Sequence, residues 1–155
     1  RHRCEPRAKS VRFDRAEGAS PSSGFANALE TSDALVYTPS NPYLSIAPIL
    51  AVSGVRDRIR KFQGRRIAVS PIVGGKALRG PAAKLMAEFG AEPSCVGVAS
   101  QYVGLCDVFV IDEVDADRAG EVQALGFQVE VCNTVMASDQ DKVELGRRVL
   151  EIAGP

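Results

Sequence analysis

Short apolar runs alternate with longer amphipathic stretches along most of this chain. The strongest runs cover residues 34–37, 67–69, 108–111 and 127–131. Run 108–111 is apolar at every position, which is typical of a strand buried on both faces of a parallel sheet. The spacing of apolar residues between these runs predicts helices at 45–50, 55–62, 81–89, 115–125 and 143–152, and a further helix capped by Ser94. Strands that alternate with helices predict a doubly wound, mostly parallel α/β sheet of the Rossmann-like type.

The first fifteen residues are basic, and Val11 and Phe13 alternate with charged side chains there. This alternation predicts a short, half-exposed strand. The Ser-, Pro- and Gly-rich stretch 18–24 predicts a loop after it. The chain begins with Arg1 rather than Met, so we expect a fragment, a processed product or a trimmed piece of a longer protein.

Composition describes an ordinary globular chain. Its 155 residues, 45% hydrophobic and 25% charged, predict a single α/β domain over residues 1–155. Nineteen basic and nineteen acidic side chains give a formal net charge of zero. A general nucleic-acid binder needs a basic surplus, so no nucleic-acid partner is expected. No apolar run approaches a membrane span, so no membrane partner is expected either.

The cysteines give no sign of a structural metal site. They stand at 4, 95, 106 and 132 without a Cys-x-x-Cys pair, and His2 is the only histidine. Structural zinc needs four closely spaced Cys or His ligands, and a Ser-His-Asp triad needs a histidine near the nucleophile. We expect small buried side chains at Cys95, Cys106 and Cys132, and a reducing, cytoplasmic setting.

Two loops follow apolar runs and precede helix-like stretches, at 38–42 and 70–81. Because the carboxyl ends of parallel strands meet at one edge, both loops are expected at the edge where open α/β sheets bind ligands. The second loop contains Gly74, Gly75, Lys76 and Arg79. One interpretation is a cradle in which glycine N–H groups and the cations hold a phosphate. The other is a tight turn that needs positive φ and carries solvated cations. The loop does not match the Walker A pattern.

Polar residues at other strand ends allow the same two kinds of interpretation. Ser40 and Asn41 either bind a ligand or cap the backbone of their own turn. Asp112, Glu113, Asp115 and Asp117 follow a strand. They fit the start of a helix better than a magnesium site, and Asp112 is placed closest to the sheet edge. Asn133 and Thr134 follow the next strand and are expected to join this edge.

Several motifs together resemble one family. Pro-Ser-Asn-Pro-Tyr-Leu-Ser-Ile-Ala-Pro-Ile-Leu at 39–50 and Val-Ser-Pro-Ile-Val-Gly-Gly-Lys-Ala-Leu-Arg-Gly-Pro-Ala at 69–82 carry the resemblance. Val-Gly-Val-Ala at 96–99 with Tyr102, Phe-Val-Ile-Asp at 109–112 and Asn-Thr-Val-Met at 133–136 extend it. In this order, over about 11–152, they resemble the 2-phospho-L-lactate transferase family (CofD), of whose longer members the chain matches the C-terminal half.

This resemblance implies an enzyme of coenzyme F-420 biosynthesis. It would transfer a phospholactyl or phosphoenolpyruvyl group from a guanylylated donor to the deazaflavin Fo, release GMP and require Mg²⁺. For this chain the resemblance suggests nucleotide or substrate binding by Ser40, Asn41, Ser70, Gly74, Gly75 and Lys76. It assigns no catalytic residue or metal ligand here, because those are expected upstream of this chain.

The missing upstream half also leaves the family fold incomplete, and we expect weak or no activity from the chain alone. A homodimer is one assembly to consider. The alternative function is a non-catalytic nucleotide- or sugar-nucleotide-binding regulator, of the related gluconeogenesis-factor type.

Overall fold

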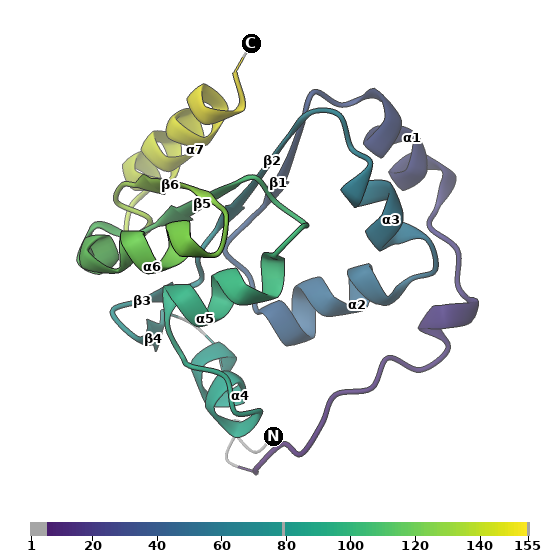
Figure 1. Ribbon diagram of the computed structural model, residues 1–155, viewed down its shortest axis with the longest axis horizontal. Coiled ribbons are helices and arrows are strands. Elements are labelled where there is room, and N and C mark those ends of the chain that lie inside the picture. Colours follow the sequence, from purple (N-terminus) through teal and green to yellow (C-terminus); the bar gives the residue numbers. More distant parts are fainter. Residues whose placement is uncertain (1–5, 79, 155) are drawn as a thin grey trace.

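A four-stranded parallel sheet forms the centre of the computed structural model, which describes residues 6–78 and 80–154 (Figure 1). The strand order is β1-β2-β5-β6, and every pairing is parallel. The strands are β1 (Ala34–Tyr37), β2 (Arg65–Val69), β5 (Val108–Ile111) and β6 (Gln128–Val131). All residues of β5 are buried, as expected for an apolar strand with a neighbour on each side. The predicted sheet is confirmed.

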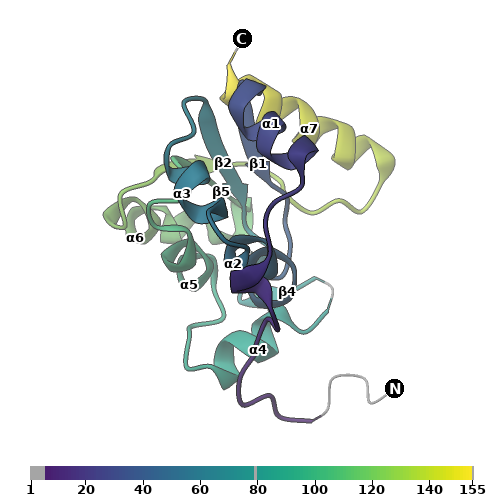
Figure 2. The ribbon, with the colours of Figure 1, turned by 90° about the vertical axis from the view of Figure 1, so that its right-hand side faces the viewer.

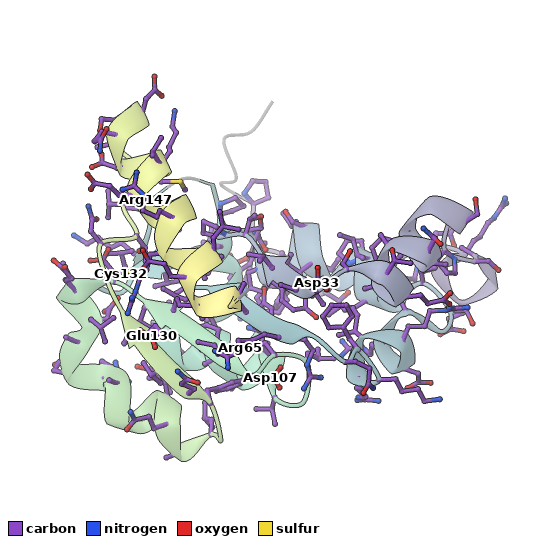
Figure 3. All side chains as sticks on the ribbon, turned by 90° about the horizontal axis from the view of Figure 1, so that it is seen from above. Asp33, Arg65, Asp107, Glu130, Cys132 and Arg147 are labelled. Atoms are coloured by element: carbon purple, nitrogen blue, oxygen red, sulfur yellow. The ribbon has the colours of Figure 1, made fainter. Side chains whose placement is uncertain are left out.

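Helices cover both faces of this sheet, which confirms the doubly wound architecture. Leu145, Val149 and Ile152 of α7 pack against one face, where β2 and β5 present Ile67, Val69, Val108 and Val110. Figure 3 shows α7 lying across that face. The other face carries Ala68, Phe109 and Ile111 and packs against the remaining helices. These are α1 (Ser23–Thr31), α2 (Ala47–Ala51), α3 (Val55–Arg60), α4 (Ala82–Glu88), α5 (Cys95–Ala99) and α6 (Ala119–Ala124); α7 spans Asp139–Ala153.

A small antiparallel hairpin stands apart from the main sheet. It pairs β3 (Ile72–Val73) with β4 (Lys76–Ala77) around the turn Gly74-Gly75. The glycines have φ of 56° and 74°, and positive φ at both central residues is the type I′ turn that suits a two-residue hairpin. We had expected one loop from β2 to α4, and the hairpin lies inside that loop. In Figures 1 and 2, α4 lies at the opposite end of the molecule from α1.

The predicted strand around Val11 and Phe13 is wrong. Residues 7–13 have no regular structure, and the first element among the described residues is a 3₁₀ turn, η1 (Ala16–Gly18). Alternation alone does not make a strand, because a strand needs a neighbour to pair with. This segment is instead attached through the Ala8 N–H, which donates to the Glu88 carboxylate at 3.0 Å. The predicted roles of His2, Cys4 and Arg79 fall outside the described residues.

Local helix starts differ from expectation in the loop after β1. Asn41, not Ser45, caps the first turn there, a π-helical turn η2 (Pro42–Ile46) that leads into α2. After β5 the chain forms a 3₁₀ stretch, η4 (Glu113–Arg118), capped by Asp112, before α6 begins. A further 3₁₀ turn, η3 (Ser100–Tyr102), follows α5. None of the helices in the described ranges is both long and apolar enough to cross a bilayer.

Candidate nucleotide pocket

A pocket of about 470 Å³ lies at the carboxyl edge of the sheet. It is lined by the loops after β1, β2 and β6, by the residues that follow the hairpin, and by one residue of α7. The lining residues are Pro39, Asn41, Ser70, Pro71, Leu78, Ala82, Thr134, Val135, Met136, Ala137 and Lys142. This volume falls within the range of small-molecule sites, and this edge is the usual ligand edge of an open α/β sheet.

Asn41 combines a structural role with an unused polar group. Its Oδ1 accepts hydrogen bonds from the backbone N–H groups of Tyr43 at 2.9 Å and Leu44 at 3.1 Å. These two bonds determine which end of the amide is oxygen, so Nδ2 is the other end. Nδ2 is buried and has no acceptor among the described residues. Asn41 therefore lines the pocket and also carries a buried N–H₂ group without an acceptor among the described residues.

Ser70 shapes the pocket with a hydroxyl that is already occupied. Its Oγ donates to the Ile72 carbonyl at 2.9 Å and accepts from the Ile72 N–H at 3.2 Å. The residue is 1% exposed. Both bonds stabilise the bend from β2 into the hairpin, so Ser70 forms a rigid wall.

The loop after β6 is held against β5 by a buried carboxylate. Asp112 Oδ2 accepts from the Thr134 N–H at 2.7 Å and from Thr134 Oγ1 at 2.9 Å, while Oδ1 accepts from the Val114 N–H at 3.0 Å. Asp112 and Thr134 are 3% exposed each. Charged hydrogen bonds of this kind are stronger than neutral ones. They set the course of residues 134–137, which form one side of the pocket.

Lys142 supplies positive charge at the rim. It lies on α7, and its Nζ pairs with Asp139 Oδ1 at 2.7 Å. Because the lysine side chain is 58% exposed, the pair is weak and screened by solvent. The ammonium group is thus able to turn toward an anion in the pocket.

The structure divides the predicted binding residues. Asn41 and Ser70 line the pocket, whereas Ser40, Gly74, Gly75 and Lys76 are not among the residues that line it. The Gly74 N–H donates to the carboxylate of Asp115, at 3.2 Å from Oδ1 and 3.1 Å from Oδ2. An anion at this turn would therefore compete with a carboxylate. Binding by these four residues stays a prediction.

Some lining residues were not predicted from sequence. Thr134 and Asn133 were both expected at this edge because they follow a strand. Thr134 lines the pocket, whereas Asn133 borders a separate hollow, together with Cys132 and Arg148. Leu78, Val135 and Met136 carry no polar chemistry that would single them out. Lys142 lies on a different element, and only the fold brings it to the edge.

A second hollow of about 330 Å³ has a different setting. It lies between α1 and α3, at residues such as Leu29, Arg58 and Phe62. The chain enters β1 and β2 from these helices, so the hollow is at the amino end of the strands. Figure 3 marks this end by Arg65 and Asp107, with Cys132 at the other end. Ligand sites of open α/β sheets lie at the carboxyl end, so this hollow is a poor candidate.

The described residues form no metal site made of protein side chains alone. No group of three or more His, Cys, Asp or Glu side chains among them is placed to hold a metal ion. The two buried carboxylates near the edge are already used, Asp112 by Val114 and Thr134, and Asp115 by Gly74.

Comparisons with known proteins agree on one family. The family model described as 2-phospho-L-lactate transferase CofD matches residues 1–151. A 2-phospho-L-lactate transferase of Methanothermobacter thermautotrophicus is 40% identical over 148 residues, which cover 96% of this chain and 47% of that protein. A phosphoenolpyruvate transferase of Streptomyces griseus is 37% identical over 89% of this chain and 44% of its own length. This chain spans about half the length of these curated relatives.

Solved structures support the fold. Protein BH3568 of Bacillus halodurans superposes with a TM-score of 0.55 at 17% identity, over 84% of this chain and 47% of that one. A second structure of BH3568, which describes it as a member of the upf0052 family, gives a TM-score of 0.51. Taken with the family match along nearly the whole sequence, the chain belongs to the 2-phospho-L-lactate transferase CofD family.

Proposed function

We propose that this chain supplies the donor-nucleotide pocket of a transferase of coenzyme F-420 biosynthesis. The reaction moves a phospholactyl or phosphoenolpyruvyl group from a guanylylated donor to a hydroxyl of the deazaflavin Fo, and GMP leaves. The names of the relatives support the transferase class. The position of the pocket, at the carboxyl edge of the sheet, supports nucleotide binding.

One observation carries this proposal: Asn41 lines that pocket, and its buried Nδ2 has no acceptor among the described residues. Leaving a buried donor unpaired costs about 1–3 kcal/mol, so a ligand that brings an acceptor recovers that free energy. A guanine carbonyl and a phosphate oxygen are both suitable acceptors. The apolar lining by Pro39, Pro71 and Met136 suits the flat face of a base.

The described residues have defined parts in this proposal. Asn41 donates to the nucleotide, Ser70 and the loop held by Asp112 shape the pocket, and Lys142 offers charge to an anionic group. Ser40, Gly74, Gly75 and Lys76 stay proposed contacts outside the pocket lining. The Mg²⁺ that the family resemblance implies is assigned to no residue of this chain, and phosphoryl-type transfer depends mostly on positioning and charge neutralisation. No catalytic step is assigned to a residue of this chain. We also propose a cytoplasmic setting and a homodimer.

Replacing Asn41 by Asp tests the pocket at its central atom. In Asn41→Asp an oxygen still caps η2, but the second oxygen is buried where Nδ2 lay, so urea denaturation must first show that the variant is folded. The donor becomes a negatively charged acceptor facing an anionic ligand. We expect GDP affinity, measured by calorimetry, to fall at least about tenfold.

Asn133→Asp is the matched control. Asn133 also uses Oδ1 to accept a backbone N–H, that of Val135 at 3.0 Å, but it does not line the pocket. It is expected to bind GDP like wild type. Equal GDP affinity in Asn41→Asp and wild type would contradict the assigned role of Asn41. Tighter binding of UDP-sugars than of GDP by wild type would instead favour the regulator.

A further inference from the structure

Asp115 makes a contact that helix formation does not require. Asp112, not Asp115, caps η4. The Asp115 carboxylate instead reaches the hairpin turn between β3 and β4, where both oxygens lie within 3.2 Å of the Gly74 nitrogen. The backbone of Asp115 leaves helical geometry, with φ −102° and ψ 15° inside the 3₁₀ stretch.

Burial of this carboxylate costs free energy, and an exposed capping residue would not have that cost. Asp115 is 7% exposed, and the Gly74 N–H is its hydrogen-bond donor among the described residues. Burial of a charged group is unfavourable unless hydrogen bonds compensate. The bond to Gly74 is therefore the interaction that stabilises the carboxylate in this position.

The hairpin is fixed at two points. Its base is anchored by Ile72, which is fully buried, and by Ala77, which packs against the same core cluster. Its turn is held by Asp115 and lies close to η4, because a Cβ added at Gly74 would meet Val114 Cγ1 at 3.3 Å. With both points held, the hairpin cannot pivot about its base.

The outgoing strand of this hairpin leads directly to the pocket. Lys76 and Ala77 of β4 are followed by Leu78, which lines the pocket although it is 55% exposed. Leu78 has little packing of its own to hold it, so its position depends on the hairpin. We infer that Asp115 is a positioning residue that, by holding Gly74, sets the Leu78 wall of the nucleotide pocket. This inference rests on the proposed function for the pocket.

Hydrogen exchange tests the contact without any ligand. Gly74 is exposed, so its amide is protected only if Asp115 accepts it, while the Gly75 N–H has no acceptor among the described residues and serves as the internal reference. We expect slow exchange at Gly74 relative to Gly75 in wild type, and exchange at least about tenfold faster in Asp115→Ala. Equal exchange of the two glycine amides in wild type would overturn the inference.

Nucleotide binding tests the consequence for the pocket. We expect Asp115→Ala to bind GDP about fivefold more weakly than wild type, and Asp115→Asn, which keeps an acceptor oxygen, to recover most of that loss. Recovery by the amide distinguishes an acceptor from a charge effect. Asp117→Asn removes the same charge from an exposed position two residues away and should bind like wild type.

The two proposals fail in different ways. Wild-type protein that does not bind GDP would overturn the proposed function. Wild-type protein that binds GDP with the same affinity as a folded Asp115→Ala would overturn only the positioning role of Asp115, as would failure of Asp115→Asn to recover binding.

Discussion

Among the described residues, the buried polar side chains find hydrogen-bond partners, with one exception. Ser70, Ser94, Asp112, Asp115 and Thr134 are buried, and each side chain takes part in at least one hydrogen bond. Folded proteins pair nearly all such groups. The Nδ2 of Asn41 is the exception among the described residues. Because Asn41 also lines the pocket, we propose that a ligand supplies the missing acceptor.

Burial of Cys106 predicts a change of stability at alkaline pH. Burial, and secondarily the negative charge of Asp107, raises the pKa of this thiol to about 12. The raised pKa favours the neutral folded form, so this contribution is complete below the unfolded pKa near 9 and is lost as the pH rises toward 12. Between pH 7 and 10.5, urea denaturation should show wild type losing about 1–2 kcal/mol more than Cys106→Ala.

Parallel stability profiles for wild type and Cys106→Ala over that range would contradict this assignment. Other alkaline titrations are common to both proteins and cancel in the comparison. Cys95, whose pKa burial raises to about 11, is among them.

Only part of this residue chemistry could be predicted from sequence. Asn41 was expected either to bind a ligand or to cap its own turn. The structure shows the cap, made by Oδ1, and leaves Nδ2 without an acceptor among the described residues, so ligand binding stays a prediction. The bond from Gly74 to Asp115 joins residues 41 positions apart, and local sequence carries no sign of it.

At the level of elements, side-chain caps mark the start of some helices, among them α1, α5 and α7. Ser94 accepts the Gly97 N–H at 3.0 Å, as expected from sequence. Ser138 forms a capping box with Asp141, in which each side chain accepts the other's backbone N–H. Since α7 packs against β2 and β5 on one face of the sheet and carries Lys142 to the pocket, this cap positions part of the site.

Loss of the capping box should destabilise the chain measurably. Ser138→Ala leaves the Asp141 N–H without its acceptor. We therefore expect the free energy of unfolding, measured by urea denaturation, to be about 1 kcal/mol lower than that of wild type. Ser45→Ala is the control, because the Ser45 side chain has no hydrogen bond in the described structure. Equal destabilisation by both substitutions would show that the box contributes nothing specific.

Strands were easier to predict than short turns. The four strands of the main sheet were expected within two residues of their bounds, because buried parallel strands are apolar nearly throughout. The hairpin was missed because strands of two residues each have no detectable period. The strand expected around Val11 and Phe13 failed for the opposite reason, since a local alternation had no pairing partner.

At the scale of the molecule, the parallel topology brings loops that are far apart in the sequence together at one site. Loops after β1, β2 and β6 meet at a single edge because all four strands run in the same direction. This convergence was predictable from the alternation of strands and helices. The contribution of α7 was not, since it depends on the angle at which that helix packs. The chain spans about half of its curated relatives, so the transfer reaction as a whole stays a proposal.

A titration of the isotope-labelled chain with GDP, followed by amide and side-chain NMR, shows whether the nucleotide enters the pocket beside Asn41. We expect saturable shifts at the Asn41 side-chain amide, at Ser70 and at residues 134–137, with little change between α1 and α3. Shifts confined to the α1–α3 hollow, or no saturable shift at millimolar GDP, would contradict the proposed pocket.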